Sequence, residues 1–208
     1  MAAVTPSPDK RDARAKLLEA ALRLVRTQGY AATSVDDLCR AAGLTKGAFF
    51  HHFASKNALA VAAAKYWSET TSALFAAAPY HDHKDPLDRV LAYIDFRVGL
   101  LHGDVPDFTC LVGTLVQEAY SIDAIRAACE ASISGHAHTL EADIEAARKK
   151  HRIKGDWTAQ SLALHTQAVI QGAFILAKAK GGAAIAAESI AHLRRYIELL
   201  FSKRSTST

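Results

Sequence analysis

Cysteine is scarce in this 208-residue sequence, and no C-x-x-C spacing occurs. Cys39, Cys110 and Cys129 are an odd number of thiols, far apart along the chain. They predict neither a disulfide framework nor a zinc site, and they fit a reducing compartment. We therefore expect no metal and no cofactor.

Long apolar runs are also missing. No segment approaches about 18 consecutive apolar residues, and the first ten residues have no apolar core of the signal-peptide type. This absence predicts a cytoplasmic protein without a membrane partner. Two-residue alternation of apolar and polar residues is absent as well, which argues against a β-sheet.

The sequence lacks the common catalytic motifs. It has no G-x-S-x-G, no H-E-x-x-H, no phosphate-binding P-loop and no Rossmann glycine pattern. His136, His138 and Glu141 fall within about one and a half helical turns, but no nucleophile or metal set accompanies them. We interpret them as an exposed polar face and expect that the protein is not an enzyme.

Helical patterns fill the rest of the chain. Half of the residues are hydrophobic, which is ample for a buried core. Pro79 to Pro86 is predicted to be a loop. Amphipathic spacing, caps and glycine stops predict an all-α fold, with helices over residues 9–28, 57–78, 87–102, 109–119, 121–151, 157–179 and 183–201.

The net charge of +4 is concentrated at the amino terminus. Residues 1–60 hold nine Lys and Arg against five Asp and Glu, whereas residues 61–208 hold sixteen of each kind. This is the charge distribution expected of a nucleic-acid-binding module joined to a neutral domain.

Residues 33–56 have the spacing of a helix-turn-helix. Thr33 and Ser34 cap a short helix that Gly43 ends, and Thr45 caps a second helix. On the second helix Gly47 faces outward, although an interior glycine costs a helix about 1 kcal/mol. Close approach to a DNA groove explains such a residue; an ordinary helical pair within a larger core is the alternative.

The stretch from Arg11 to about Leu59 resembles the DNA-binding domain of the TetR family of bacterial transcriptional regulators. The resemblance rests on Gly29-Tyr30, Thr33-Ser34-Val35, Ala41-Ala42-Gly43 and the segment from Lys46 to Phe53, followed by Ser55-Lys56. It implies a three-helix DNA-binding domain at 9–56 and a helical ligand-binding and dimerisation domain at 57–208, about nine helices in all. The prolines, serine and threonine of the first residues predict a disordered tail at 1–8.

The same resemblance implies the DNA contacts. Phe50 stands where the family commonly has a tyrosine whose hydroxyl touches phosphate, so that hydrogen bond is not possible here. The residues implied to contact bases or phosphates are Thr33, Ser34, Thr45, Lys46, Gly47, Ala48, Phe50, His51, His52 and Lys56.

The last two predicted helices carry apolar stripes that need a partner. In the TetR resemblance they pair with their twofold copies, which implies a homodimer with two recognition helices about 34 Å apart on an inverted-repeat operator. The stripe residues assigned to dimerisation are Leu162, Thr166, Val169, Ala173, Leu176, Ile190, Leu193, Ile197 and Leu200.

A small-molecule effector is expected inside the second domain. Its candidate contacts are bulky apolar residues with a few polar ones, although residues of these types more often belong to the core than to a ligand site. They are Trp67, Phe75, Phe96, Leu100, Phe108, Cys110, Leu111, Leu115, Gln117, His165, Gln171 and Phe174.

Cys110 supports an alternative. The segment from Pro106 to Ala128 resembles a TetR subgroup that includes electrophile- and oxidant-responsive repressors with a sensor cysteine at this point. A reactive thiol also needs a nearby cation or helix N-terminus and access to solvent. A cysteine-based redox switch is therefore the alternative on the same scaffold.

The expected function is transcriptional repression, with release from a palindromic operator when a small, mostly apolar ligand binds. When bound to DNA the protein is expected at the nucleoid. An architectural protein that binds any DNA is the alternative from another class, and it would show phosphate-driven affinity with little sequence preference.

Overall fold

The computed structural model describes residues 8–202, with side chains from residue 12 onward, and the described part is helical without strands. The expected tail at 1–8 lies outside the described residues except for Pro8, which begins the first helix. The helices are α1 (Pro8–Gln28), α2 (Val35–Ala42), α3 (Lys46–His52), α4 (Lys56–Ala76), η1 (Pro79–Asp82), α5 (Pro86–Gly99), α6 (Val105–Phe108), α7 (Leu111–Ala119), α8 (Asp123–His151), α9 (Ala159–Lys180) and α10 (Ala184–Phe201).

These bounds confirm the predicted all-α class and most of the predicted helices. Two segments differ. The predicted loop at residues 79–86 contains the 3₁₀ turn η1, and a short helix, α6, precedes the helix expected at residue 109. Asp104 caps α6, since its backbone N–H bonds to the carboxylate of Asp107 at 2.9 Å, and Pro106 sits in the first turn, where its missing N–H is harmless.

The chain forms two compact units. Unit 1 comprises residues 1–71 and 110–132, and unit 2 comprises residues 72–109 and 133–208. Helices α4 and α8 contribute to both. The boundary expected between a DNA-binding domain at 9–56 and a second domain at 57–208 stays a prediction.

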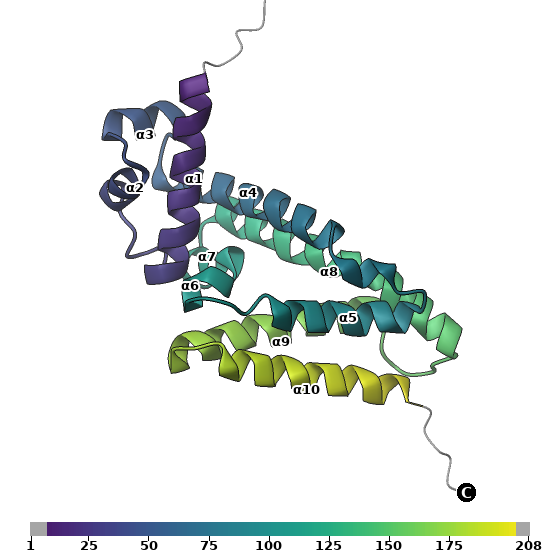
Figure 1. Cartoon of the computed structure of the whole chain (residues 1–208). Helices are drawn as coiled ribbons and strands as arrows, with labels where there is room; N and C mark the ends of the chain where they lie inside the picture. Colours follow the sequence, from purple (N-terminus) through teal and green to yellow (C-terminus); the bar gives the residue numbers. More distant parts are fainter. Residues whose placement is uncertain (1–7, 203–208) are drawn as a thin grey trace, which may run out of the picture. The chain divides into compact units, whose positions relative to one another are not determined.

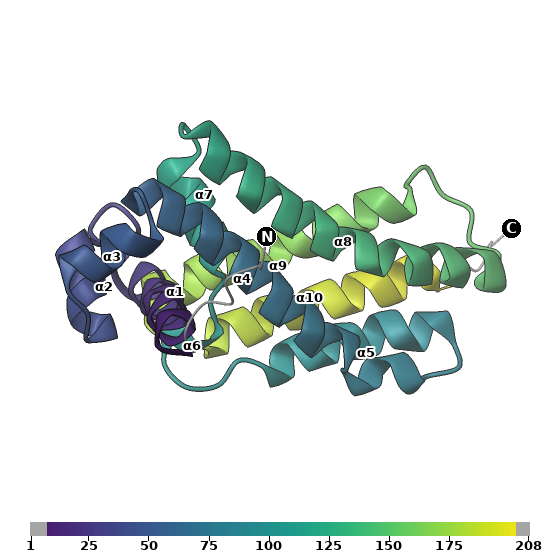
Figure 2. The same cartoon turned by 90° about the horizontal axis from the view of Figure 1, so that it is seen from above.

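Unit 1 is built on α1. Helices α2 and α3 pack against it on one side (Figures 1 and 2), and α7 packs against it as well. Its core consists of large apolar side chains that are at most 2% exposed, because the apolar positions of α1 recur at helical spacing on one face; they include Leu17, Leu18, Leu38, Phe49, Leu59, Leu111 and Leu115.

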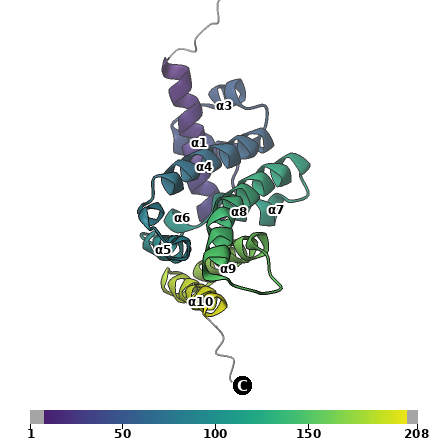
Figure 3. The same ribbon diagram turned by 90° about the vertical axis from the view of Figure 1, so that its right-hand side faces the viewer.

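Unit 2 is a bundle in which α10 lies against both α5 and α9 (Figures 1 and 3). Gly181, with φ 74°, ends α9 and allows the chain to turn back into α10. Ion pairs join the helices: Arg89 on α5 bonds Asp143 on α8 at 2.6 Å, and Arg194 on α10 bonds Asp95 on α5 at 2.9 Å. No helix in residues 8–202 is both long and apolar enough to cross a membrane.

Candidate nucleic-acid interface

Helix α2 begins with a reciprocal cap. Ser34 Oγ accepts a hydrogen bond from the Asp37 N–H at 3.1 Å, and the Asp37 carboxylate accepts one from the Ser34 N–H at 3.0 Å. The Ser34 hydrogen bonds lower the pKa of Asp37. Ser34 is exposed, so its hydroxyl lies at the surface where the sequence placed a phosphate contact.

The turn between α2 and α3 follows the predicted chemistry. Gly43 has φ 65°, a left-handed conformation that side chains disfavour, and the Leu44 N–H closes the end of α2 by bonding to the Cys39 carbonyl at 2.9 Å. Thr45 Oγ1 accepts from the Ala48 N–H at 3.2 Å and starts α3. Phe49 on α3 is fully buried, which fixes the rotation of this short helix.

The opposite face of α3 is exposed. Its exposed residues are Lys46, Gly47, Phe50 and His51. Phe50 is 55% exposed despite its apolar character. A Cβ added to Gly47 would meet nothing closer than Thr45 Oγ1 at 3.7 Å. The fold of the chain itself therefore does not require a glycine at this position.

Lys46 is held by a partner that sequence reasoning missed. Its ammonium pairs with the Asp36 carboxylate on α2 at 2.8 Å, and this hydrogen bond raises the pKa of Lys46. The pair joins the first turn of α2 to the first turn of α3, so it orients the lysine at the edge of the exposed face. The six other predicted contacts on α3 or its cap lie on or beside this face: Thr45, Gly47, Ala48, Phe50, His51 and His52.

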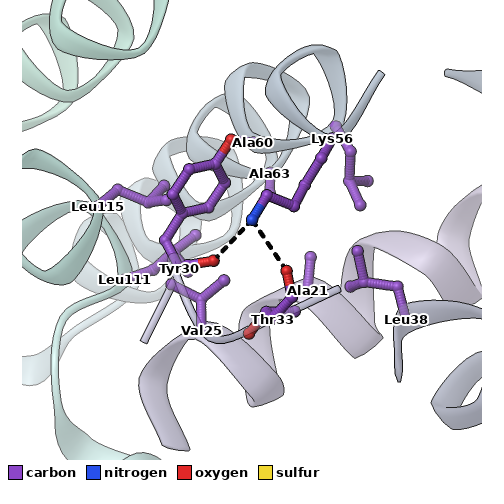
Figure 4. Close-up of a pocket in the computed structure, with 11 residues that line it drawn as sticks. Ala21, Val25, Tyr30, Thr33, Leu38, Lys56, Ala60, Ala63, Leu111 and Leu115 are labelled. Atoms are coloured by element: carbon purple, nitrogen blue, oxygen red, sulfur yellow. Dashed lines mark hydrogen bonds between the residues drawn. The ribbon is translucent and has the colours of Figure 1, made fainter. Parts of the chain in front are cut away.

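Lys56 and Thr33 are placed differently from expectation. The Lys56 ammonium donates to the carbonyl oxygens of Tyr30 and Thr33, each at 3.0 Å, and lies 4.2 Å from the centre of the Tyr30 ring (Figure 4). Thr33 is 2% exposed, and its hydroxyl donates to the Gly29 carbonyl at 2.6 Å. These side chains brace the start of α4 against the segment before α2, and this geometry argues against the phosphate contacts predicted for them.

The space beside Lys56 is small. A cavity of about 10 Å³ is lined by Lys56, Tyr30, Leu111, Leu115 and apolar residues of α1 and α4 (Figure 4). A volume of this size holds at most one water molecule. It does not accommodate an effector.

Helix α7 is tied to the same segment. Glu118 Oε2 accepts a hydrogen bond from the Ala31 N–H at 2.8 Å. Gly29 has φ 90°, a conformation that favours glycine, and a Cβ there would lie 2.5 Å from the Glu118 carboxylate, which would have to move away from Ala31. No sequence signal pointed to Glu118, because its partner lies 87 residues away.

The predicted effector contacts belong to both units. In unit 1, Leu111 and Leu115 are fully buried core, and Trp67 lies under the Arg26 guanidinium at 5.1 Å. Gln117 is exposed and donates to the carbonyl of Gly113.

In unit 2 the structure brings four of the predicted aromatic residues into two ring contacts. Phe75 and Phe96 have ring centres 5.5 Å apart, and Phe108 and Phe174 have ring centres 6.3 Å apart. His165 is exposed and contacts the ring of Tyr196 on α10 edge to face, with ring centres 5.3 Å apart. Leu100 and Gln171 are half-buried. The effector role of each of these residues stays a prediction.

Cys110 is buried, as are Cys39 and Cys129. It precedes the first residue of α7, but Leu111 and Val112 beside it are buried too. Burial and the nearby Cys110 raise the pKa of Cys129 to about 12. A buried thiol in apolar surroundings is inert, so the structure does not favour the cysteine-based alternative.

The stripe assigned to dimerisation is largely the inward face of α9 and α10. Six of its nine residues are buried within unit 2: Leu162, Thr166, Ala173, Ile190, Leu193 and Ile197. Val169 and Leu200 are half-buried, and Leu176 is exposed. For the six buried residues this corrects the sequence-based expectation, since side chains that pack within one chain are not available to a second; the dimer role of the other three stays a prediction.

A buried polar group in unit 2 was also missed. The Tyr93 hydroxyl lies 2.9 Å from His136 Nε2 and accepts a hydrogen bond from Gln167 Nε2 at 3.2 Å. Burial and, as a smaller contribution, the positive charge of Arg97 together lower the pKa of His136 to about 4. The ring is therefore neutral near pH 7. The three residues come from three helices, so no local spacing reveals them.

Comparison with known proteins agrees with this geometry. The sequence profile described as "Bacterial regulatory proteins, tetR family" matches residues 17–63, which run from α1 into α4. The regulator TtgR of Pseudomonas putida is 35% identical over 79 residues, which are 38% of this chain and 38% of that protein. The chain spans less than half the length of the curated relatives it matches.

Solved structures extend the likeness along the chain. A TetR transcriptional regulator from Chloroflexus aurantiacus matches with a TM-score of 0.77 and 26% identity, covering 92% of this chain and 97% of that one. A TetR-family regulator from Agrobacterium tumefaciens matches with a TM-score of 0.78 and 22% identity, covering 90% and 98%. The profile, the curated relatives and the solved structures are all of TetR-family regulators: residues 17–63 match the family profile, and the fold of the chain is similar to solved members of that family.

Proposed function

We propose that the protein is a transcriptional repressor that binds an inverted-repeat operator as a homodimer and leaves it when a small molecule binds. The observation that carries this proposal is the exposed face of α3, where Gly47 leaves the backbone open and Lys46, Phe50 and His51 surround it. A recognition helix enters the major groove with such residues toward the bases.

Roles on this face follow from the chemistry of each side chain. Lys46, Ser34 and Thr45 are suited to phosphate oxygens, and His51 and His52 to phosphates or base edges. Phe50 has no hydroxyl to offer a phosphate, and its exposed ring is suited to the methyl group of a thymine or to a deoxyribose. Gly47 and Ala48 allow close approach.

The dimer is proposed to form through the outward face of α9 and α10. Five large apolar or aromatic side chains on these helices are 43% to 71% exposed, namely Leu164, Ile175, Leu176, Tyr196 and Leu199. On α9, Leu164 and Ile175 lie opposite the buried Leu162 and Ala173 at helical spacing. We call this set the α9–α10 face, and a twofold copy of the same face would cover it.

The effector is proposed to bind in the carboxy-terminal helices, where the aromatic residues of unit 2 gather. Coupling would arise if the ligand-bound dimer holds its recognition helices at a separation that does not match the operator. Operator binding would place the protein at the chromosome, in the cytoplasm.

The test is selection of bound fragments from sheared chromosomal DNA of the source organism, followed by transcription in vitro from an enriched promoter. We expect the enriched fragments to share an inverted repeat and expect added protein to lower transcription from them. Transcription that rises with added protein would contradict repression, and enrichment without any shared sequence would contradict operator recognition.

A further inference from the structure

Arg97 on α5 is stacked between aromatic rings and has no carboxylate partner. Its guanidinium carbon lies 5.1 Å from the centre of the Phe75 ring and 5.7 Å from that of Phe174. Among residues 8–202, no Asp or Glu lies within ion-pairing distance of it and no acceptor takes a hydrogen bond from it. Arg89, on the same helix, pairs with Asp143 at 2.6 Å.

A guanidinium carries five N–H donors, so the absence of a partner needs an explanation. Arg97 is only half-buried, and its nitrogen atoms are not among the enclosed, unbonded side-chain atoms of the described residues, which are Thr109 Oγ1 and Arg148 Nε. Solvent therefore reaches the Arg97 donors. A group that is cationic, unpaired and reachable can accept an external anion.

The surroundings of Arg97 are aromatic and uncharged. The Phe75 ring contacts Tyr93, Phe96 and His136, with centre-to-centre distances of 5.8, 5.5 and 4.5 Å. Tyr93 is buried and bonded to His136 and Gln167, so none of these side chains supplies a negative charge near pH 7. The aromatic cluster keeps an uncompensated positive charge at its solvent-reachable edge.

This arrangement selects one ligand chemistry. A carboxylate pairs with both arms of a guanidinium, and the pairing is stronger where aromatic walls exclude water. Phe75, Phe174 and Tyr93 are buried and form the apolar floor beneath the cation. The half-buried rings of Phe96 and His136 keep exposed surface for contact with a flat or apolar body. A neutral apolar ligand would use the rings and leave the charge unpaired.

We propose that the cluster of Arg97, Phe75, Phe174, Tyr93 and His136 binds a carboxylate joined to an aromatic or apolar body, with Arg97 holding the carboxylate. This inference rests on the proposed function only in identifying that ligand with the effector. The binding itself is a property of unit 2 and is measurable without DNA.

The test uses isothermal titration of the full-length protein with matched pairs of probes: benzoate, cinnamate and 2-naphthoate, each beside its primary amide. The two members of a pair share size and shape and differ in charge. We expect at least one acid to bind tenfold or more tightly than its amide. Equal binding of acid and amide, or no binding of any acid at millimolar concentration, would overturn the proposal.

The variant Arg97→Gln removes the charge, and Lys154→Gln in the exposed segment after α8 removes a charge of the same sign elsewhere. We expect Arg97→Gln to abolish the preference for the acid and Lys154→Gln to retain it. A preference that survives in a folded Arg97→Gln protein would assign the carboxylate to another site. The acid-amide comparison on the unmodified protein decides the matter if Arg97→Gln does not fold.

Operator release is measured separately with the acid that binds best. Acid binding without operator release would leave the carboxylate site standing and contradict its effector role. Specific operator binding together with failure of every acid to bind would overturn this inference and leave the proposed repressor standing.

Discussion

Two lysines near the recognition helix have opposite surroundings. Lys46 is exposed and pairs with one carboxylate at the surface. The Lys56 ammonium instead donates hydrogen bonds to two backbone carbonyl oxygens and lies over the Tyr30 ring. A charged donor that bonds buried carbonyls is structural, because its loss leaves those oxygens unsatisfied. A surface ion pair is weak and can be exchanged for a phosphate.

Replacing each lysine by methionine separates these roles. For Lys56→Met we expect the free energy of unfolding to fall by about 1–3 kcal/mol, with an unchanged salt dependence of operator binding. For Lys46→Met we expect nearly unchanged stability and a slope of log affinity against log salt that is smaller by about 1. Denaturant unfolding and binding at several salt concentrations measure both. The opposite assignment of the two effects would contradict this reading.

His136 makes stability depend on pH. Its pKa is about 4 in the folded protein against an ordinary value of 6.5, because burial disfavours the charged ring. The unfolded chain therefore binds more protons between these values, and stability falls as pH drops from about 6.5 towards 4.

The full contribution of this shift is about 3 kcal/mol. Measured at pH 7 and pH 4.5, the free energy of unfolding should fall less in His136→Gln than in the unmodified protein, since glutamine does not titrate. An identical fall in both proteins would show that other groups cause the acid sensitivity. His138 on the same helix is exposed, so His138→Gln is the matched control and should behave like the unmodified protein.

At the scale of helices, α3 has one buried face and one exposed face, and the exposed face includes a glycine. Gly47 lies in its first turn with open space around it. An alanine there should favour the helix but bring a methyl group towards the DNA. These two effects have opposite signs.

For Gly47→Ala we expect a stability gain of up to about 1 kcal/mol and operator binding that is weaker by roughly tenfold, or about 1.4 kcal/mol. Thermal unfolding and fluorescence anisotropy measure the two quantities. Gly135→Ala on α8 is the control, since a Cβ there would meet nothing within 4 Å and the variant should gain stability without losing affinity. Unchanged affinity in Gly47→Ala would remove the close-approach explanation.

The helix-turn-helix could be predicted because its signals are local. Ser34, Asp37, Gly43 and Thr45 act within four residues of their partners. The inward turn of Lys56 could not be predicted, because its partners are carbonyls 23 and 26 residues away. The short helix α6 was missed because Gly103 and Pro106 are typical of loops as well as of helix starts.

The two faces of α9 explain the error in the dimer stripe. Leu162 and Thr166 on one side, and Leu164 and Ile175 on the other, both follow helical spacing. Periodicity shows that each face needs cover but does not show which face the same chain covers. The sequence did not predict the cluster around Arg97 for a related reason. Its residues come from four helices, α4, α5, α8 and α9, which only the tertiary fold brings together.

At the scale of the whole molecule, an inverted-repeat operator requires two copies of the chain. The α9–α10 face exposes large apolar side chains with no cover in the single chain, and such patches commonly mark interfaces. Leu199 is the most exposed of them at 71%.

We expect Leu199→Glu combined with Ile175→Glu to convert a dimer into a monomer, because two carboxylates would be buried without partners. Light scattering coupled to size-exclusion chromatography gives the mass. Leu74→Glu, at an exposed leucine of α4, is the control and should remain dimeric. A double variant that stays dimeric would place the interface elsewhere.

Sequence-specific recognition by a dimer is the central claim, and selection of bound sequences from a random duplex library tests it most directly. We expect an inverted repeat whose half-sites lie about one helical turn, or 34 Å, apart. We expect the protein to bind this repeat far more tightly than random duplex at two salt concentrations. Recovery of no common sequence, with an affinity that falls steeply as salt rises, would show that the helix-turn-helix contacts phosphates only. That result would contradict sequence-specific recognition.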